Sequence, residues 1–541
     1  MAIKEKYPDF LLLYQIGDFF EMFFEDAQRG SGLLDIVLTK KHDIPMCGIP
    51  VHSLDNYLER LVRKGVMVAI CEQIEDAYGK RRNSPIKREV TRLVTPGTLT
   101  EDKFLETRKH NFLMAITKNG SDPTVLGLSW VDLSTGEFKT SPSKISLLST
   151  DLARLSPNEI LCPLNVTETK DINTILNGYY VTIWPQKDFC PIKGKQFLTK
   201  LFGVESSRNI KPVGDQNFTD EELSSCNAVL EYISYTQKGK MPKLSEPERF
   251  FAKTIMFIDA VTRRSLELTT TQFGEKKGSV LEELDCTVTP MGARLLSSRL
   301  TSPLTSSLEI QRRLDLVEYF YGHSVFREKL RSMMRACHDL ERCLQRLTLG
   351  RGGPRDLAAI ASTLTEMSHI KEEVIHYNEL NPQKLPELLE TILKKLEASA
   401  SLKDLVSLLE RALVDDPPAN ITFGDFITEG YCPQLDEQRK LKLHGQKYLE
   451  DLTVQYQTKY GLPFRLRHSP SSGYVVTLSP SNHKLVDTQH FKNSRSYKGA
   501  MAYKTIDILE LEVKVDKAVF AVKQREEEIF AELCSETMKR Y

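Results

Sequence analysis

Short apolar runs and one amphipathic stretch share the first hundred residues. The run over residues 10–16 predicts a buried strand that ends at Gly17, and the run over residues 66–71 predicts a second buried strand. Between them, residues 55–64 place apolar side chains at helical spacing, which predicts a helix. This mixture of patterns indicates an α/β domain at the N-terminus.

A second α/β pattern follows over residues 110–220. The apolar runs 112–116 and 126–132 predict two strands, and the Asn-Gly pair at 119–120 is typical of a turn between paired strands. The segment 134–136 (Ser-Thr-Gly) predicts a further turn.

From about residue 221 onward the apolar spacing is helical for roughly 200 residues. Segments rich in Gly and Pro, at 349–354 and 415–418, are strong helix stops. Residues 461–480 then alternate like strands, and the last 35 or so residues return to a helix. The apolar stripe of this last helix consists of Ile508, Leu511, Val515, Val519, Val522, Ile529 and Leu533. Two long helices around a small β insert are typical of a lever that carries a tip domain.

Composition narrows the class of protein. With 541 residues, of which 40% are hydrophobic and 27% charged, the chain is expected to fold into several globular domains. The ten cysteines form no CxxC pair and no cluster with histidine, which favours reduced thiols over disulfides or a zinc site. No apolar run is long enough for a membrane span. Residues 1–6 resemble neither a signal peptide nor a presequence, so either the protein needs no import or its presequence lies outside this chain.

The total charge indicates no partner, because Lys+Arg and Asp+Glu both number 73, but basic residues cluster locally in two places. The first cluster is either a solvated loop or a phosphate-facing segment. It consists of Lys80, Arg81, Arg82, Lys87, Arg88 and Arg92. In the second, residues 445–500 contain eight Lys or Arg and three acids, a net charge of +5, with tyrosines interspersed. This excess fits contact with a phosphate backbone and equally fits the charged surface of a small exposed domain.

The segment Gly17-Asp18-Phe19-Phe20-Glu21-Met22-Phe23 places a carboxylate inside a run of aromatic side chains. In a strand, residues i and i+2 share a face, so Phe19 and Glu21 would point the same way. A ring beside a charge suits a core poorly. It suits a wedge that enters a base stack, next to an acid that hydrogen-bonds the disturbed base. The alternative is an amphipathic segment whose acid is solvated.

Colinear motifs resemble those of the MutS family of DNA mismatch-repair sensors over essentially the whole chain. Besides residues 17–23, these motifs are residues 44–50, 68–73, 92–98, 259–268 and 285–294. The fold class that the resemblance implies is multidomain α/β plus all-α. Its implied segments are a mixed α/β mismatch-binding domain (1–107), an RNase-H-like α/β connector (108–220), a helical core and lever domain (221–444), a small β clamp (445–500) and a returning lever helix (501–541).

The same resemblance implies roles for single residues. Phe19 corresponds to the ring that the family wedges from the minor groove beside a mispaired or unpaired base, and Glu21 to the acid that hydrogen-bonds that base. The implied partner is double-stranded DNA with mismatches or small loops, and no membrane. The residues implied to contact the DNA backbone are Lys40, Lys41, Arg465, Arg467, Lys492 and Arg495.

One departure from the family is large. MutS proteins carry an ATPase domain with a loop that ends in Gly-Lys-Ser/Thr, and residues 1–541 contain no such sequence. We therefore expect a fragment or a truncated gene model. As it stands, we expect the chain to hydrolyse no ATP and to have no catalytic residue, metal or cofactor of its own. The family's ATP and Mg²⁺ belong to that domain. Most dimer contacts also belong there, so we expect a homodimer or MutS-like dimer at full length.

Residues 127–138 and 274–279 resemble the fungal mitochondrial branch of the family. This likeness implies a mitochondrial location. The lack of a presequence in residues 1–6 leaves the bacterial cytoplasm or the nucleus as the alternative.

Two other functions stay open. Asp132 lies on a strand of the RNase-H-like unit, a fold that hosts two-metal nucleases. Its segment offers no clear partner carboxylates, and a structural or solvated aspartate is the simpler interpretation. The other is a non-catalytic assembly scaffold built on the helical levers, which would show no preference for mismatched DNA.

Overall fold

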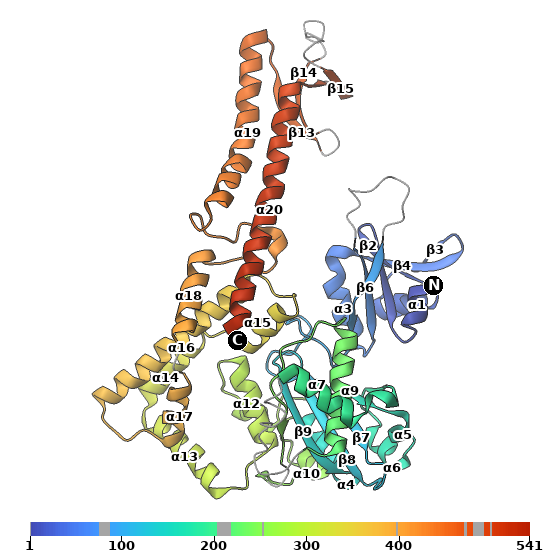
Figure 1. Cartoon of the computed structure of the whole chain (residues 1–541), viewed down its shortest axis with the longest axis vertical. Coiled ribbons are helices and arrows are strands. Elements are labelled where there is room, and N and C mark those ends of the chain that lie inside the picture. The colour runs from blue at the N-terminus through green and yellow to red at the C-terminus, as the bar shows by residue number, and fades with distance from the viewer. Residues whose placement is uncertain are drawn as a thin grey trace. The chain divides into compact units, whose positions relative to one another are not determined.

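The computed structural model describes residues 2–74, 87–202, 218–251, 254–396, 399–469, 473–479, 492–497 and 500–540. The chain divides into two compact units. One consists of Met1–Gly352 with Ser362–Glu397, and the other of Gly353–Ala361 with Ala398–Tyr541 (Figure 1). Of the first basic cluster, Lys80, Arg81 and Arg82 lie outside the described residues.

A six-stranded sheet in the order β3-β4-β2-β1-β5-β6 organises the N-terminal domain. Strands β1 and β5 are parallel, and the other neighbours are antiparallel. Both predicted strands and the predicted helix are confirmed. The elements are α1 (Ala2–Lys6), β1 (Leu11–Ile16), β2 (Phe19–Phe23), α2 (Phe24–Leu34), β3 (Thr39–Lys41), β4 (Ile44–Pro50), η1 (Val51–Ser53), α3 (Leu54–Arg63), β5 (Val68–Gln73) and β6 (Arg88–Val94).

One face of this sheet forms the domain's core. Alternate residues of the central strands, such as Leu11, Leu13, Phe20 and Met22, pack there with apolar residues of α2 and α3. Burial of these side chains supplies most of the domain's stabilisation, at roughly 1.5–3 kcal/mol for each large aliphatic or aromatic side chain. On the other face, a smaller apolar cluster around Ala69 and Leu93 covers part of the sheet, whereas Phe19 of β2 stays exposed there.

A second six-stranded sheet, in the order β11-β10-β7-β8-β9-β12, forms the connector. The predicted strand pair is confirmed, because β7 and β8 are antiparallel neighbours joined through the turn that begins at Asn119. Helix α9 packs on β7 and β8. The elements are β7 (Phe112–Lys118), β8 (Val125–Asp132), β9 (Glu137–Lys144), α4 (Ile145–Leu155), β10 (Glu159–Cys162), α5 (Leu164–Thr167), α6 (Lys170–Leu176), β11 (Val181–Ile183), η2 (Gln186–Asp188), α7 (Pro191–Phe202), α9 (Asp220–Thr236) and β12 (Glu248–Arg249).

Nearly all of helix α9 and the whole of strand β12 follow residue 220, where the implied connector ends. Even so, α9 packs on this sheet, and β12 pairs with β9 as its edge strand. A capping box between Thr219 and Glu222 starts α9. Glu222 also forms an ion pair with Arg249, one of the two residues of β12. The boundaries of the implied domains stay predictions.

The following region is helical, as predicted. The predicted break at 349–354 is confirmed: α15 ends at Thr348, and α16 begins at Pro354. The elements are α10 (Ala260–Ser265), α11 (Val280–Leu284), α12 (Pro290–Thr301), α13 (Ser307–Gly322), α14 (Ser324–Met334), α15 (Leu340–Thr348), α16 (Pro354–Leu380), α17 (Glu387–Lys395), α18 (Ala400–Ala412) and η4 (Ile421–Phe423). Among the helices of the described residues, none has the length and apolarity needed to cross a bilayer.

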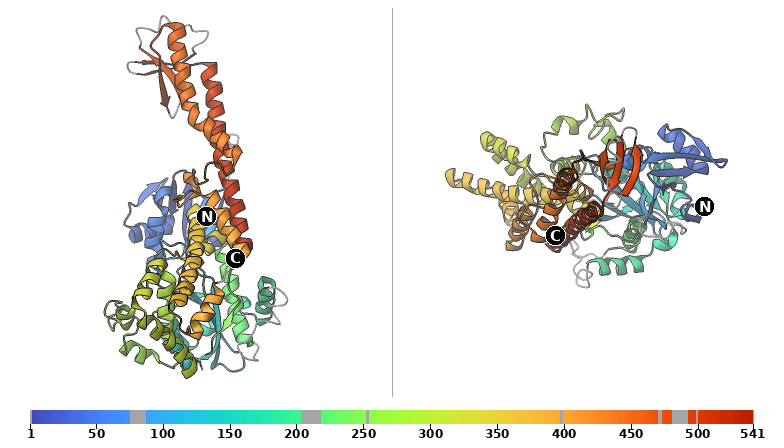
Figure 2. Two further views of the ribbon diagram at one scale, coloured as in Figure 1. Left: turned by 90° about the vertical axis from the view of Figure 1, so that its left-hand side faces the viewer. Right: turned by 90° about the horizontal axis from the view of Figure 1, so that it is seen from above.

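In the second unit, α19 (Pro433–Tyr460) and α20 (Ile506–Arg540) lie side by side (Figure 2). Between them in sequence comes a four-stranded antiparallel sheet in the order β13-β14-β16-β15. Its strands are β13 (Arg465–Ser469), β14 (Gly473–Leu478), β15 (Lys492–Tyr497) and β16 (Ala500–Lys504). The predicted β insert between two long helices is thus confirmed.

The predicted apolar stripe of the last helix is wrong at one position. Ile508, Val522, Ile529 and Leu533 are buried, but Val519 is exposed and Ala518 is buried in its place. One residue turns a helix by about 100°, so Val519 faces outward when Ala518 faces inward. The side chains of Leu511 and Val515 lie outside the described residues.

Candidate nucleic-acid interface

Strand β2 places Phe19 and Glu21 on the same face of the first sheet. Phe20 and Met22, which alternate with them, are buried in the core. Phe19 is 49% exposed, although phenylalanine is one of the residues most often found inside proteins. We call the face that carries Phe19, Glu21 and Phe23 the open face of the sheet.

A tight hairpin presents Phe19 at the start of its strand. Ile16 pairs with Phe19, so only Gly17 and Asp18 form the loop. Gly17 has a φ of +58°, a conformation that glycine adopts without strain and that two-residue hairpin loops require. The backbone oxygen of Asp18 also accepts a hydrogen bond from the backbone N–H of Val51, at 2.9 Å. The ring therefore stands beside a short, anchored loop.

Glu21 lies between two neighbouring strands on the open face. It pairs with Tyr14 of β1 on one side and with Gly48 of β4 on the other. Its carboxylate is 3.4 Å from the ammonium group of Lys41, so the structure brings Lys41 to Glu21. Lys40, which precedes Lys41 in β3, is exposed and is not brought to this pair.

Two contacts on the open face were not anticipated from the sequence. One is the ion pair of Lys41 with Glu21, which joins residues on two different hairpins. The other is the stacking of Arg88 over the ring of Tyr14, at 5.3 Å from the guanidinium carbon to the ring centre. Arg88 also donates a hydrogen bond to the backbone oxygen of Gln15, at 2.7 Å. Such contacts depend on strand register, and no local pattern encodes them.

In the second unit, β13 carries two of the predicted backbone contacts. Arg465 and Arg467 are exposed, while Leu466 between them packs against the core of the small sheet. Lys492 and Arg495 lie in β15, but their side chains are outside the described residues. The alternation in β13 leaves two positive charges on the surface.

Three family models match successive parts of the chain. MutS domain I matches residues 1–103, MutS domain II matches residues 111–245, and MutS domain III matches residues 261–541, which is more than half of the chain. The chain belongs to the MutS family. The predicted multidomain α/β plus all-α fold class is confirmed with it.

Several MutS proteins of bacteria are similar to the chain over nearly its whole length. A protein named DNA mismatch repair protein MutS from Wolbachia pipientis wMel is 36% identical over 573 residues, which cover 100% of this chain and 66% of that protein. Proteins of the same name from Cereibacter sphaeroides and Ruegeria pomeroyi are 38% and 37% identical, and the matches cover 60% and 61% of them. The chain thus spans less than two thirds of the length of these relatives.

Several residues of the MutS-like motifs hold domains of the first unit together. In motif 92–98, the Thr95 hydroxyl and the Gly97 backbone N–H donate to the buried carboxylate of Glu159, at 2.6 and 2.9 Å. In motif 285–294, Asp285 accepts two hydrogen bonds from Arg108, at 2.6 and 3.2 Å. These roles are structural, because both partners lie within the protein.

Asp132, the residue of the nuclease alternative, is fully buried. It accepts hydrogen bonds from the backbone N–H and the hydroxyl of Ser134 and from the backbone N–H of Asn111, and His110 Nδ1 lies 2.9 Å away. Burial alone would raise the pKa of Asp132, but these hydrogen bonds and the charges of His110 and Arg342 bring it below the ordinary value. Within the described residues, no group of three or more His, Cys, Asp or Glu is arranged to hold a metal ion. The nuclease alternative has no support.

Replacing Asp132 tests its structural role. We expect Asp132→Asn to lower the free energy of unfolding at pH 7 by about 2–3 kcal/mol. The amide NH₂ that replaces one carboxylate oxygen is itself a donor, and it would face the groups that donate to that oxygen in the unaltered chain. The pKa is lower in the folded chain, so the loss is largest above the unfolded pKa and shrinks below about pH 4. Urea unfolding at pH 7 and below about pH 4 measures this loss of free energy. Asp9→Asn, in an exposed turn, is the matched control. An unchanged free energy of unfolding would contradict the structural role.

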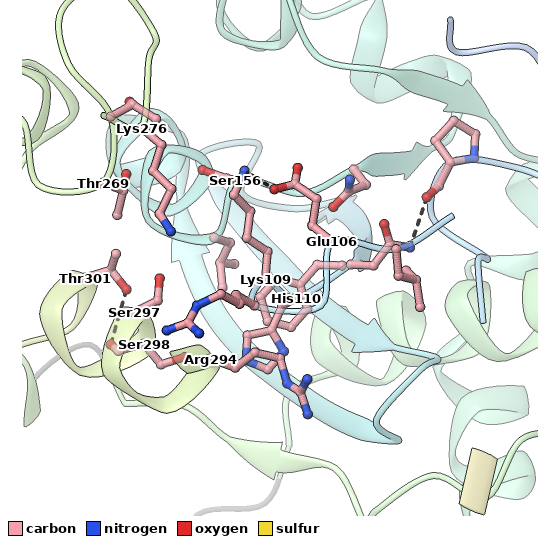
Figure 3. Close-up of a pocket in the computed structure, with 18 of the residues that line it drawn as sticks. Glu106, Lys109, His110, Ser156, Thr269, Lys276, Arg294, Ser297, Ser298 and Thr301 are labelled. Carbon is pink, nitrogen blue, oxygen red and sulfur yellow. Dashed lines mark hydrogen bonds and ion pairs between the residues drawn. The ribbon is translucent and has the colours of Figure 1, made fainter. Parts of the chain in front are cut away.

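A cavity of about 870 Å³ lies where the MutS-like domains of the first unit meet. Figure 3 shows Ser297, Ser298 and Thr301 side by side on one wall, with Lys276 and Lys109 nearby. Its cations have internal partners: Lys109 pairs with Glu106, Lys276 with Glu282, and Arg108 and Arg294 with buried or half-buried aspartates. Arg63 and Arg154 also line it and pair with Glu59 and Asp151, so each Lys and Arg among the described lining residues has an acidic partner.

Proposed function

We propose that this chain recognises mispaired or unpaired bases in duplex DNA. The observation that carries the proposal is the half-exposed ring of Phe19 beside Glu21 on the open face, in a chain that belongs to the MutS family. The ring would enter the base stack from the minor groove, and the carboxylate would accept a hydrogen bond from the displaced base.

The energetics favour a defective base pair. Unstacking a base step costs a few kcal/mol, and less where the pair is already mismatched. An aromatic side chain regains roughly 1–3 kcal/mol by stacking. A carboxylate is repelled by the phosphates, so its position is favourable only where a base donates to it. Recognition of this kind reads the deformability of DNA rather than its sequence.

The proposed backbone contacts are exposed cations of both units. Lys40 and Lys41 lie on β3, the edge strand of the first sheet, and Arg465 and Arg467 lie on the small sheet. Lys492 and Arg495 remain in the proposal on the resemblance alone. Contacts of this kind add affinity for any duplex and make it depend on salt.

Binding of the 541-residue chain to matched and mismatched DNA tests this function. The probe is a labelled duplex of about two helical turns with a central G·T pair or one unpaired base, and the control is the fully paired duplex. Fluorescence anisotropy should give tighter binding to either defective duplex. Equal affinities for all three would contradict the proposal and favour the scaffold alternative.

Glu21→Gln separates the hydrogen bond from the charge. We expect the preference for a mismatch to fall by about 1.5 kcal/mol, roughly tenfold, because the hydrogen bond loses its charged acceptor. Affinity for the matched duplex should stay the same or rise, since a repelled charge is gone. Anisotropy measures both affinities, and Glu25→Gln, an exposed acid on α2, is the matched control. A marked loss of matched-duplex binding would contradict this account.

The remaining functional assignments are proposals that rest on the resemblance. We propose that residues 1–541 by themselves bind no ATP and no Mg²⁺, because they lack the Gly-Lys-Ser/Thr loop. Dimerisation belongs to a longer MutS-like protein. The relatives compared above are bacterial, so they lend no support to a mitochondrial location.

A further inference from the structure

The carboxylate of Glu21 leans away from the solvent and toward the β3–β4 hairpin. Its side chain is only 14% exposed, although it lies on the open face beside the half-exposed Phe19. Its neighbour on β4 is Gly48, and a methyl group built there would lie 3.6 Å from Glu21 Cγ. This is an ordinary van der Waals distance, so the Glu21 side chain lies against Gly48 of β4.

Lys41 meets the carboxylate at the far side of Gly48. Its ammonium group is 3.4 Å from Glu21 Oε2. The two-residue turn of His42 and Asp43, both with left-handed φ values of 51° and 64°, closes the hairpin directly after Lys41. This tight turn sets where the lysine starts. Lys40 alternates with Lys41 along β3 and leaves the opposite side of the strand.

The carboxylate that pairs with Lys41 is the same group that is proposed to accept a hydrogen bond from a base beside the ring of Phe19. We propose that Lys41 is a positioning residue for Glu21. It holds the carboxylate in the free chain and on matched DNA, and it turns to a backbone phosphate when Glu21 moves to a displaced base. This inference rests on the proposed function and adds an exchange of partners within it.

The exchange has a consequence for salt dependence. Each phosphate neutralised by a cation contributes about 0.9 to the slope of log affinity against log salt concentration. If Lys41 stays with Glu21 on matched DNA, it contributes to the slope only on mismatched DNA. An ordinary backbone contact, such as the one proposed for Lys40, contributes equally on both duplexes.

The experiment measures anisotropy titrations of matched and G·T-containing duplexes between about 50 and 200 mM salt. The variants are Lys41→Gln, Lys41→Arg, Glu21→Gln and the double variant that combines Glu21→Gln with Lys41→Gln. Lys40→Gln is the matched control. We expect Lys41→Gln to make the slope of log affinity against log salt shallower by about 0.9 on the mismatched duplex alone. Affinity for the mismatched duplex should fall about two- to fivefold. Lys41→Arg should behave like the unaltered chain.

Glu21→Gln provides the second arm. Without its carboxylate partner, Lys41 is free on both duplexes, so adding Lys41→Gln should then lower both slopes equally. Lys40→Gln should lower both slopes equally with or without Glu21. Equal effects of Lys41→Gln on both duplexes while Glu21 is present would overturn this inference alone. Absence of any mismatch preference in the unaltered chain would overturn the proposed function and this inference with it.

Discussion

Replacing Phe19 with alanine should remove most of the preference for mismatched DNA. The ring is the group proposed to take the place of lost base stacking, worth roughly 1–3 kcal/mol, so the ratio of affinities should fall by about 5- to 150-fold. Binding to a matched duplex, and its dependence on salt, should change little because the phosphate contacts remain. Anisotropy titrations of both duplexes with the 541-residue chain measure the ratio.

Two features make this substitution interpretable. Phe19 is half exposed, so its loss should leave the fold intact, whereas Phe20 beside it is buried and its truncation would cost about 3–5 kcal/mol. Phe257→Ala removes an equally large ring from an exposed position away from the open face, and it should preserve the preference. A Phe19→Ala chain that keeps its full preference would contradict the wedge.

The local elements were predictable because each has a short-range signal. The apolar run at 10–16 becomes β1, and the run at 126–132 becomes nearly all of β8. The Gly and Pro residues at 349–354 separate α15 from α16, since glycine and proline act on their own backbone. Such signals need no knowledge of the rest of the fold.

What could not be predicted depends on partners that are distant in the chain. Helix α9 begins at the predicted boundary near residue 220. It packs back on β7 and β8, because its apolar side chains are buried against those of the sheet. Val519 was misplaced because one residue decides which side of α20 faces its neighbour. The pairing of Lys41 with Glu21 requires the register of three strands at once.

The candidate site shows the same division. Alternation alone places Phe19 and Glu21 together, yet it cannot separate a wedge from an amphipathic segment. The exposure of the ring and the burial of Phe20 and Met22 fit the first, since an ordinary amphipathic strand turns its aromatic side chains inward. Membership of the MutS family supports the same interpretation.

The second large effect is expected in the small sheet. Reversing both charges with Arg465→Glu and Arg467→Glu should weaken binding to every duplex about tenfold or more at low salt. It should also make the slope of log affinity against log salt shallower by about 2, because each arginine is proposed to neutralise one phosphate. The mismatch preference should persist, since these residues belong to a different unit from Phe19.

The control must carry the same change of charge elsewhere in the same unit. Lys523→Glu with Lys539→Glu does so on exposed positions of α20, at least about 25 Å along the helix from its start at Ile506. Thermal unfolding of both double variants verifies folding, which matters because Val475, opposite Arg467, is buried. If reversal at 465 and 467 leaves the slope where the control leaves it, these arginines contact no phosphate. The electrostatic contribution would then have to come from cations such as Lys40, whose exposed position on β3 gives it the same chemistry in the other unit.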